Sequence, residues 1–317
     1  MIDPAFIIDP FEPAYQTLRD RGELTDRAAA ARALLAECRA CPRGCGVDRA
    51  AGETKVCGIG RNAIVASAGP HMGEEDCLRG SRGSGTIFFA RCNLACVFCQ
   101  NWEISRHASG AECDPPEIAT LMLDLQSEGC HNINLVSPSH VLPQVVEAIA
   151  VAAAGGLRIP IVYNTNGYDS LDGLRLLEGL VDIYMPDFKF WEPASAGALC
   201  GANDYPERAR AVITEMHRQV GPLRFGPDGI ARRGVLVRHL IMPGRTDECR
   251  SILAWLATEL SRDTYVNLLG QYRPAHQVGP KHAEIDRRPT RSELEAAHDA
   301  AREAGIWRLD ARLRSCG

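Results

Sequence analysis

Six short runs of apolar and β-branched residues alternate with helical stretches from residue 85 onward, and this alternation restricts the fold more than any other feature. Such runs are typical of parallel sheets, in which a helix crosses over between successive strands. The expected strands span 85–90, 132–137, 159–165, 181–187, 234–242 and 264–270. The expected helices span 116–127, 142–154, 170–179, 205–220, 247–261 and 291–304. Because six strands are too few to close a TIM barrel, we predict an α/β fold with an open, partial (β/α)6 TIM-like barrel.

The first 84 residues differ in character from the rest of the 317-residue chain. An Ala- and Leu-rich helix is expected at 26–38, and residues 38–84 are rich in Gly, Cys and Arg, which indicates irregular structure. We therefore predict two units: an N-terminal helix with a small cysteine-rich metal-binding module at 1–84, and the partial barrel at 85–317.

Charge and hydropathy exclude two classes of partner. The net charge of −5 argues against a general nucleic-acid-binding protein, which is usually basic. The N-terminus lacks the basic and apolar regions of a signal peptide, and the longest apolar run, at 145–157, is too short to span a bilayer. We expect a cytoplasmic protein that binds neither nucleic acid nor membranes.

The chain has thirteen cysteines, and seven of them fall into two groups. In a reducing compartment, clustered cysteines bind metal more often than they form disulfides, whereas scattered ones are usually small buried apolar residues. The first group is Cys38, Cys41, Cys45 and Cys57, and the second is Cys92, Cys96 and Cys99.

The second group has the spacing C-x3-C-x2-C and directly follows the first expected barrel strand. Structural zinc sites are closed by four protein ligands, and a [4Fe–4S] cluster normally takes four cysteines as well. Three cysteines leave one iron without a protein ligand, and an open coordination position is what a catalytic cluster needs. The alternative is a Cys3His zinc site that includes His107, but this histidine lies eight residues beyond Cys99.

The first group has the spacing C-x2-C-x3-C-x11-C, with nearby glycines that permit tight turns. Four cysteines suit either a structural zinc ion or a second iron–sulfur cluster, and the sequence leaves both open. Because the segment offers little apolar surface, a metal would help it to hold its shape.

Polar residues lie at the C-terminal ends of several expected strands, and in parallel barrels these ends form the rim that carries the active site. Each residue also has a simpler explanation: an ion pair for Asp187 and Lys189, a structural contact for Arg238, a turn at Asn166. Their shared position favours a binding site. The candidates are Ser137, Ser139, Asn166, Asp187, Lys189 and Arg238.

The cysteine motif, with Phe98 before its last cysteine, resembles the signature of the radical S-adenosylmethionine (SAM) superfamily. The segments GTIFFARCNLACVFCQNWEIS, TNG, MPDFK and VRHLIMPG are similar to the pyruvate formate-lyase activating enzyme group. The QYRP run and the N-terminal cysteine module resemble an uncharacterised, activase-like subfamily. The resemblance covers about residues 68–285.

This resemblance implies a [4Fe–4S] cluster on Cys92, Cys96 and Cys99 whose open iron binds SAM. It implies an oxidoreductase-type enzyme that cleaves SAM reductively to a 5′-deoxyadenosyl radical, with flavodoxin or ferredoxin as the electron donor. The radical would take hydrogen from a substrate, which in an activase is a glycine of a glycyl radical enzyme. The alternatives are radical modification of a small molecule or peptide, and an iron–sulfur redox sensor or cluster carrier without turnover.

The resemblance also implies SAM contacts for individual residues. Phe98 would contact the adenine through its backbone, and Asp187 and Lys189 would bind the ribose or the carboxylate. Arg238 would lie over the methionyl end, and Asn166 is a further candidate for the ribose.

One segment departs from the pattern of the family. Many members carry GGE after the second strand to hold the methionyl amino group, whereas this chain has VSPSH at 136–140. Ser137, Ser139 or His140 is expected to replace that contact.

Overall fold

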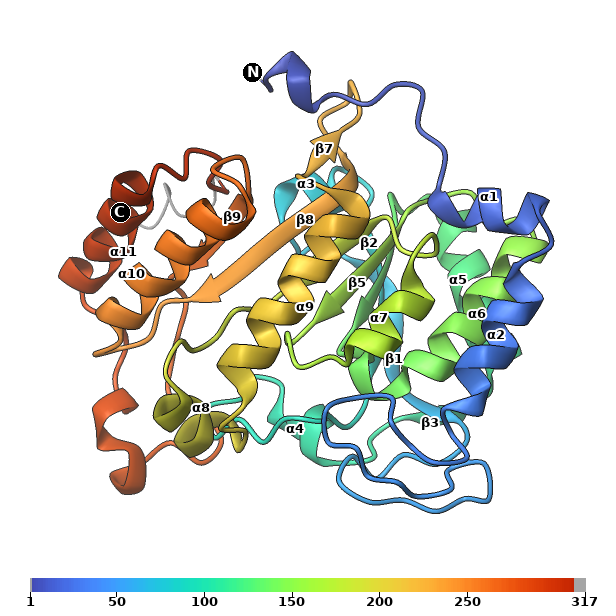
Figure 1. The fold of residues 1–317 in the computed structure, drawn as a ribbon, viewed down its shortest axis with the longest axis horizontal. Helices are drawn as coiled ribbons and strands as arrows, with labels where there is room; N and C mark the ends of the chain where they lie inside the picture. The colour runs from blue at the N-terminus through green and yellow to red at the C-terminus, as the bar shows by residue number, and fades with distance from the viewer. Residues whose placement is uncertain (1, 311–317) are drawn as a thin grey trace.

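The computed structural model describes residues 2–310, and an open nine-stranded sheet forms its centre (Figure 1). The strand order is β3-β1-β2-β4-β5-β6-β8, and both β7 and β9 pair with β8. Six strands, in the order β2-β4-β5-β6-β8-β9, are parallel to their neighbours. The other three pair antiparallel: β1 with β2 and with β3, and β7 with β8. The sheet does not close on itself, which confirms the predicted partial barrel.

All six expected strands are present in residues 2–310, close to their predicted bounds. They are β2 (Ser84–Phe89), β4 (Ile133–Val136), β5 (Ile161–Thr165), β6 (Ile183–Pro186), β8 (Ala231–Leu240) and β9 (Tyr265–Leu269). Their apolar residues are buried on both faces, as expected for parallel strands with helices between them.

Three further strands were not expected: β1 (Ala63–His71), β3 (Ala111–Cys113) and β7 (Arg224–Phe225). The prediction that residues 38–84 are irregular is therefore wrong for β1, which pairs antiparallel with β2. Only Ile64 and Val65 of β1 are β-branched, and the small residues and the Gly–Pro pair that follow them do not indicate a strand. The sheet thus begins inside the segment that was expected to form the N-terminal module.

The expected helices are also present, and a π-helical turn, η3 (Leu256–Leu260), continues the one that begins at Thr246. They are α2 (Leu24–Ala33), α5 (Pro115–Ser127), α6 (Leu142–Ala154), α7 (Leu171–Leu177), α9 (Tyr205–Val220), α10 (Thr246–Trp255) and α11 (Arg291–Ala304). The shorter helices are η1 (Pro4–Phe6), α1 (Ala14–Asp20), α3 (Asp76–Arg79), α4 (Trp102–Arg106), η2 (Pro138–Val141), α8 (Pro193–Cys200) and η4 (Pro280–Ile285). No helix in the described part of the chain has the length and apolar character needed to cross a bilayer.

The two faces of the sheet carry separate hydrophobic cores. Helices cover the outer face, where α1 and α2 pack beside α6 (Figure 1). The concave face carries a smaller core that includes Val162, Met185 and Leu236. Leu78 of α3 and Phe6 of η1 join this inner core. The polar residues at the C-terminal ends of the strands are not part of this core, and they line a pocket at that end of the barrel.

Asp182, just before β6, gives a testable pH dependence of stability. Its buried carboxylate accepts hydrogen bonds from the backbone N–H groups of Ala14 (2.8 Å) and Ile161 (3.1 Å). Burial raises its pKa from 3.8 to about 7 despite these donors. The folded state therefore favours the protonated acid, and this contribution to stability is lost as the pH rises through about 7.

Replacing Asp182→Asn should remove this pH dependence. Urea unfolding at pH 5 and pH 8 should show the wild-type chain losing a few kcal/mol more stability than the variant over this interval, since each pKa unit corresponds to about 1.4 kcal/mol. Parallel stability curves for the two proteins would contradict the assignment.

Candidate functional site

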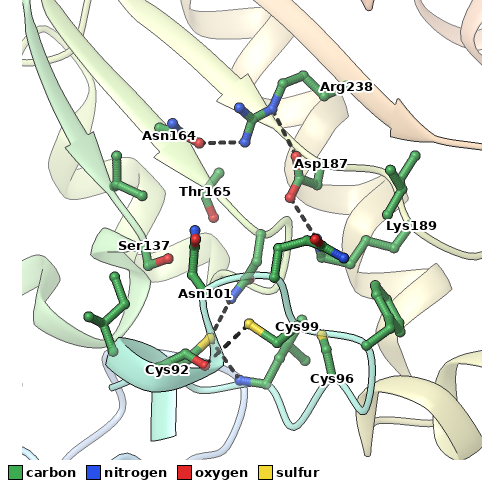
Figure 2. A pocket seen from close by; sticks show the side chains of 18 of the residues that line it. Cys92, Cys96, Cys99, Asn101, Ser137, Asn164, Thr165, Asp187, Lys189 and Arg238 are labelled. Carbon is green, nitrogen blue, oxygen red and sulfur yellow. Dashed lines mark hydrogen bonds and ion pairs between the residues drawn. The ribbon is translucent and has the colours of Figure 1, made fainter. Parts of the chain in front are cut away.

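A pocket with a volume of about 280 Å³ lies at the C-terminal ends of the parallel strands (Figure 2). The loop after β2 forms one wall, and the ends of β4, β5, β6, β8 and β9 form the others. Most of the predicted site residues line it. They are Cys92, Cys96, Phe98, Cys99, Ser137, Asn166, Asp187, Lys189 and Arg238.

Hydrogen-bond donors converge on the cysteine sulfur atoms. The N–H of Leu94 lies 3.4 Å and the amide nitrogen of Asn166 lies 3.3 Å from the Sγ atom of Cys92. Burial raises the pKa of the Cys92 thiol to about 11, and both donors act against that rise. The Sγ atom of Cys99 lies 3.2 Å from the hydroxyl oxygen of Ser105. Since donors to sulfur favour the thiolate, which is the form that binds iron, this set fits a cluster with three cysteine ligands.

The cysteine loop is anchored to the end of α8. The N–H groups of Ala95 and Val97 donate to the carbonyls of Cys200 and Leu199, each at 2.9 Å. The same contact brings the Sγ atoms of Cys96 and Cys200 to 3.4 Å from each other. Sequence reasoning missed Cys200 as a neighbour of the motif, because 104 residues separate the two cysteines and only tertiary packing joins them.

The structure does not support the Cys3His alternative. His107 lies outside the pocket and is exposed, and its ring contacts Trp102 edge-on. Neither a histidine nor a fourth cysteine is found among the described residues that line the pocket. Across residues 2–310, no three His, Cys, Asp or Glu side chains are arranged to hold a single metal ion, and this applies to both cysteine groups as well.

A chain of charges crosses the opposite wall of the pocket, where Asp187 lies between two cations (Figure 2). Its carboxylate accepts from Nζ of Lys189 at 2.6 Å and from Nε of Arg238 at 2.9 Å. Burial acts to raise the pKa of Asp187, but the charges of Arg238 and Lys189 outweigh it and hold the pKa below its usual value. The ion pair expected from the sequence therefore exists, and it faces the same cavity as the cysteines.

Several residues that line the pocket were not among the predicted contacts, and Asn164 and Thr165 are two of them. Asn164 accepts a hydrogen bond from Nη2 of Arg238 at 2.7 Å, which fixes the guanidinium together with Asp187. Thr165 donates to the buried carboxylate of Asp169, one turn further along the chain. Asn164 could have been predicted from side-chain alternation along β5, because residues two apart in a strand point to the same face and Asn166 was already a candidate.

Of the three candidates that replace the GGE motif, only Ser137 lines the pocket. It adopts a left-handed conformation with φ of 59°. Ser139 is fully buried, and its hydroxyl lies 3.0 Å from that of Thr165. His140 is also buried, its Nε2 atom pairs with the carbonyl of Ala90, and burial lowers its pKa to about 4. Of the three candidates, Ser137 is therefore the one that faces the cavity.

Phe98 and Asn166 each have a structural role at the pocket. The Phe98 ring is buried and packs edge-to-face on Phe190, with the ring centroids 5.8 Å apart. This arrangement is compatible with a ligand contact through the Phe98 backbone. The Asn166 amide donates to the side-chain oxygen of Asn93 at 2.8 Å as well as to Cys92.

The N-terminal cysteines lie outside this pocket but close to it. Cys38 and Cys41 are buried, whereas Cys45 and Cys57 are partly exposed. The loop that carries them runs beside α4 (Figure 1). Arg43, within this loop, donates to the carbonyl of Asn93 at 2.8 Å. The two cysteine groups are therefore in adjoining segments of the structure.

One family model matches the chain. The model of the radical SAM superfamily matches residues 86–256, which is more than half of the chain. An uncharacterised protein of Methanocaldococcus jannaschii is 29% identical over 282 residues, which cover 87% of this chain and 77% of that protein.

Solved structures resemble the chain only over part of their length. The radical SAM methyltransferase TsrM of Kitasatospora setae, solved with tryptophan and a SAM analogue, has a TM-score of 0.41 and 13% identity, covering 58% of this chain and 35% of TsrM. SuiB of Streptococcus suis, bound to SAM, has a TM-score of 0.44 and 10% identity, covering 67% of this chain and 45% of SuiB. The chain thus spans less than half the length of either structure.

Proposed function

Because the chain belongs to the radical SAM superfamily, we propose that it is an enzyme that cleaves SAM reductively and takes a hydrogen atom from a substrate. The observation that carries this proposal is the pocket that unites three cysteines with Asp187, Lys189 and Arg238. When bound, the cluster on these cysteines supplies the electron that breaks the sulfonium bond of SAM and so generates the hydrogen-abstracting radical. A sensor or cluster carrier without turnover would not need the polar wall opposite the cysteines.

The residues of the pocket would bind and orient SAM. Arg238 is held by Asp187 and Asn164, and its Nη1 atom lies 4.0 Å from the carboxylate of Glu74. In this position its guanidinium would bind the carboxylate of SAM. Ser137 is the candidate for the methionyl amino group, because it replaces the GGE contact and lines the pocket. The buried Phe98 ring closes one side and keeps water away from that wall.

We further propose that the substrate is a glycine of a glycyl radical enzyme, as in the activating enzymes that the cysteine loop and strand ends resemble. Radical modification of a small molecule or a peptide is the second candidate. The electron donor would be flavodoxin or ferredoxin in the cytoplasm. The first cysteine group would bind zinc or a second iron–sulfur cluster.

Two assays test these proposals in sequence. Anaerobically reconstituted, dithionite-reduced protein should convert SAM to 5′-deoxyadenosine and methionine, measured by liquid chromatography. An intact cluster without any cleavage would refute the enzyme proposal. Addition of a glycyl radical protein encoded beside this gene should then give a glycyl radical signal in electron paramagnetic resonance. Cleavage without that signal would favour a small-molecule or peptide substrate.

The replacement Asp187→Asn should weaken SAM binding. It leaves Lys189 and Arg238 without their shared carboxylate, so the guanidinium loses a charged hydrogen bond worth roughly 1.5–3 kcal/mol. We expect the KM for SAM to rise by about 10- to 100-fold while the iron content stays unchanged. The matched control is Asp172→Asn, which removes the partner of Arg175 from an exposed surface pair and should leave KM unchanged. Equal KM values in both variants would contradict the role of Asp187.

A further inference from the structure

The first cysteine group, Cys38, Cys41, Cys45 and Cys57, lies in a loop built from tight turns. The N–H of Gly44 donates to the carbonyl of Cys41, and that of Gly46 donates to the carbonyl of Cys38. Both glycines have positive φ angles, 49° and 68°, so these turns require glycine. The segment of the fourth cysteine reaches the other three, because Nζ of Lys55, two residues before Cys57, donates to the carbonyl of Cys45 at 3.5 Å.

A buried arginine points its guanidinium at this group. Arg49 is 1% exposed, and its Nη1 atom lies 3.7 Å from the Sγ atom of Cys38 and donates to the carbonyl of His140 at 2.8 Å. Its Nε atom donates to the carbonyl of Gly60, and its Nη2 atom is buried without a hydrogen-bond partner. None of the ion pairs found among residues 2–310 includes Arg49, and its hydrogen bonds go to two backbone carbonyls and the Cys38 sulfur.

A second guanidinium lies on the other side of the group. The side chain of Arg91 packs against Gly58, which directly follows Cys57, and its Nε atom is buried without a partner. Its Nη1 atom donates to the carbonyl of Arg106 at 2.7 Å. A buried cation without an anion costs several kcal/mol, so the buried Arg49 beside four thiols indicates a missing negative charge. Arg91 is only partly buried and also lines the SAM pocket, so its charge is shared with that site.

We propose that Cys38, Cys41, Cys45 and Cys57 bind a thiophilic metal centre as four thiolates, and that Arg49 supplies its counter-charge. Four thiolates leave a net negative charge on either a zinc ion or a [4Fe–4S] core, and binding releases the four thiol protons to solvent. The sulfur atoms are not gathered around one point among the described residues, so the metal must draw the loop together. This site does not depend on the reaction proposed above.

The metal centre would also position the wall of the SAM pocket. Arg43 of the same loop donates to the carbonyl of Asn93, which directly follows Cys92. The side chain of Asn93 in turn accepts from Asn166, the donor to the Cys92 sulfur. A loop fixed by metal would therefore hold both asparagines beside that cysteine.

Metal analysis of two full-length proteins tests the site. The triple variant Cys92→Ala, Cys96→Ala, Cys99→Ala lacks the second cysteine group and should still carry about one zinc, or about four irons with equal sulfide, per chain. The result identifies the metal. The wild-type protein, analysed after anaerobic reconstitution, should hold that metal in addition to the irons bound by Cys92, Cys96 and Cys99, which makes the test independent of how the variant folds. A wild-type protein with only about four irons and no zinc would overturn the proposal.

The role of Arg49 has its own measurement, the rate at which a chelator removes the metal from the triple variant. The further change Arg49→Met should speed release by at least about tenfold, because the thiolates lose their counter-charge, and Arg49→Lys should restore most of the difference. The control is Arg27→Met, because the hydrogen bonds of Arg27 go to three backbone carbonyls and none goes to a cysteine sulfur. Equal rates for Arg49→Met and Arg27→Met would refute the counter-charge.

Discussion

Replacement of Cys96 by alanine is expected to abolish SAM cleavage. The pocket offers three cysteines and no further cysteine or histidine among the described residues that line it, so the loss of one leaves two protein ligands for the cluster. Two thiolates are too few to hold the cluster against release, and the chemistry that it supplies disappears with it. We expect 5′-deoxyadenosine formation to fall by at least about 100-fold, since even residues that only support metal ligands cost about 10- to 100-fold.

The neighbouring thiol of Cys200 provides a strict control. Its sulfur lies 3.4 Å from that of Cys96, but Cys200 is fully buried and absent from the pocket lining, whereas Cys96 is partly exposed and lines the pocket. The replacement Cys200→Ala should keep the iron, the sulfide and the visible absorbance of the cluster, together with SAM cleavage. If Cys200→Ala lost the cluster while Cys96→Ala kept it, the assignment of ligands from the motif would be wrong.

The parallel strands and their helices could be predicted from the sequence because their signals are local. Strands β4, β5 and β6 consist of apolar runs bounded by turns, and α6 and α9 begin and end where the pattern predicts. The antiparallel strands β1, β3 and β7 have no such signal. They form because a partner strand offers free backbone groups, and a sequence read alone does not show that partner.

The site divides in the same way. Cys92, Asp187 and Arg238 could be placed together because the C-terminal ends of parallel strands meet at one rim. The sequence could not show that Ser139 and His140 lie outside the pocket lining, because their orientation depends on the short helix η2 that follows Ser137. Contacts across the sequence, such as that between the cysteine loop and the end of α8, follow from tertiary packing and leave no pattern in either segment.

Replacement of Gly167 by alanine is expected to unfold or severely destabilise the protein. Gly167 follows β5 with a φ of +80°, and a Cβ atom there would lie 2.3 Å from the carbonyl oxygen of Asp187. The left-handed conformation alone costs about 1–2 kcal/mol for a residue with a Cβ, and the collision with fixed backbone adds about 1–3 kcal/mol. We expect a loss of roughly 2–5 kcal/mol in urea unfolding, together with weaker SAM binding as Asp187 is displaced.

The replacement Gly156→Ala separates the collision from the backbone strain. Gly156 also has a positive φ, +100°, but a Cβ atom there meets nothing within 4 Å. This variant should therefore lose only about 1–2 kcal/mol, and its KM for SAM should stay at the wild-type value. Equal losses of stability in the two variants would show that the carbonyl of Asp187 can move aside. The backbone at the end of β6 would then be more mobile than its contact with Gly167 indicates. The position of the Asp187 carboxylate would have to be fixed by its ion pairs with Arg238 and Lys189 instead.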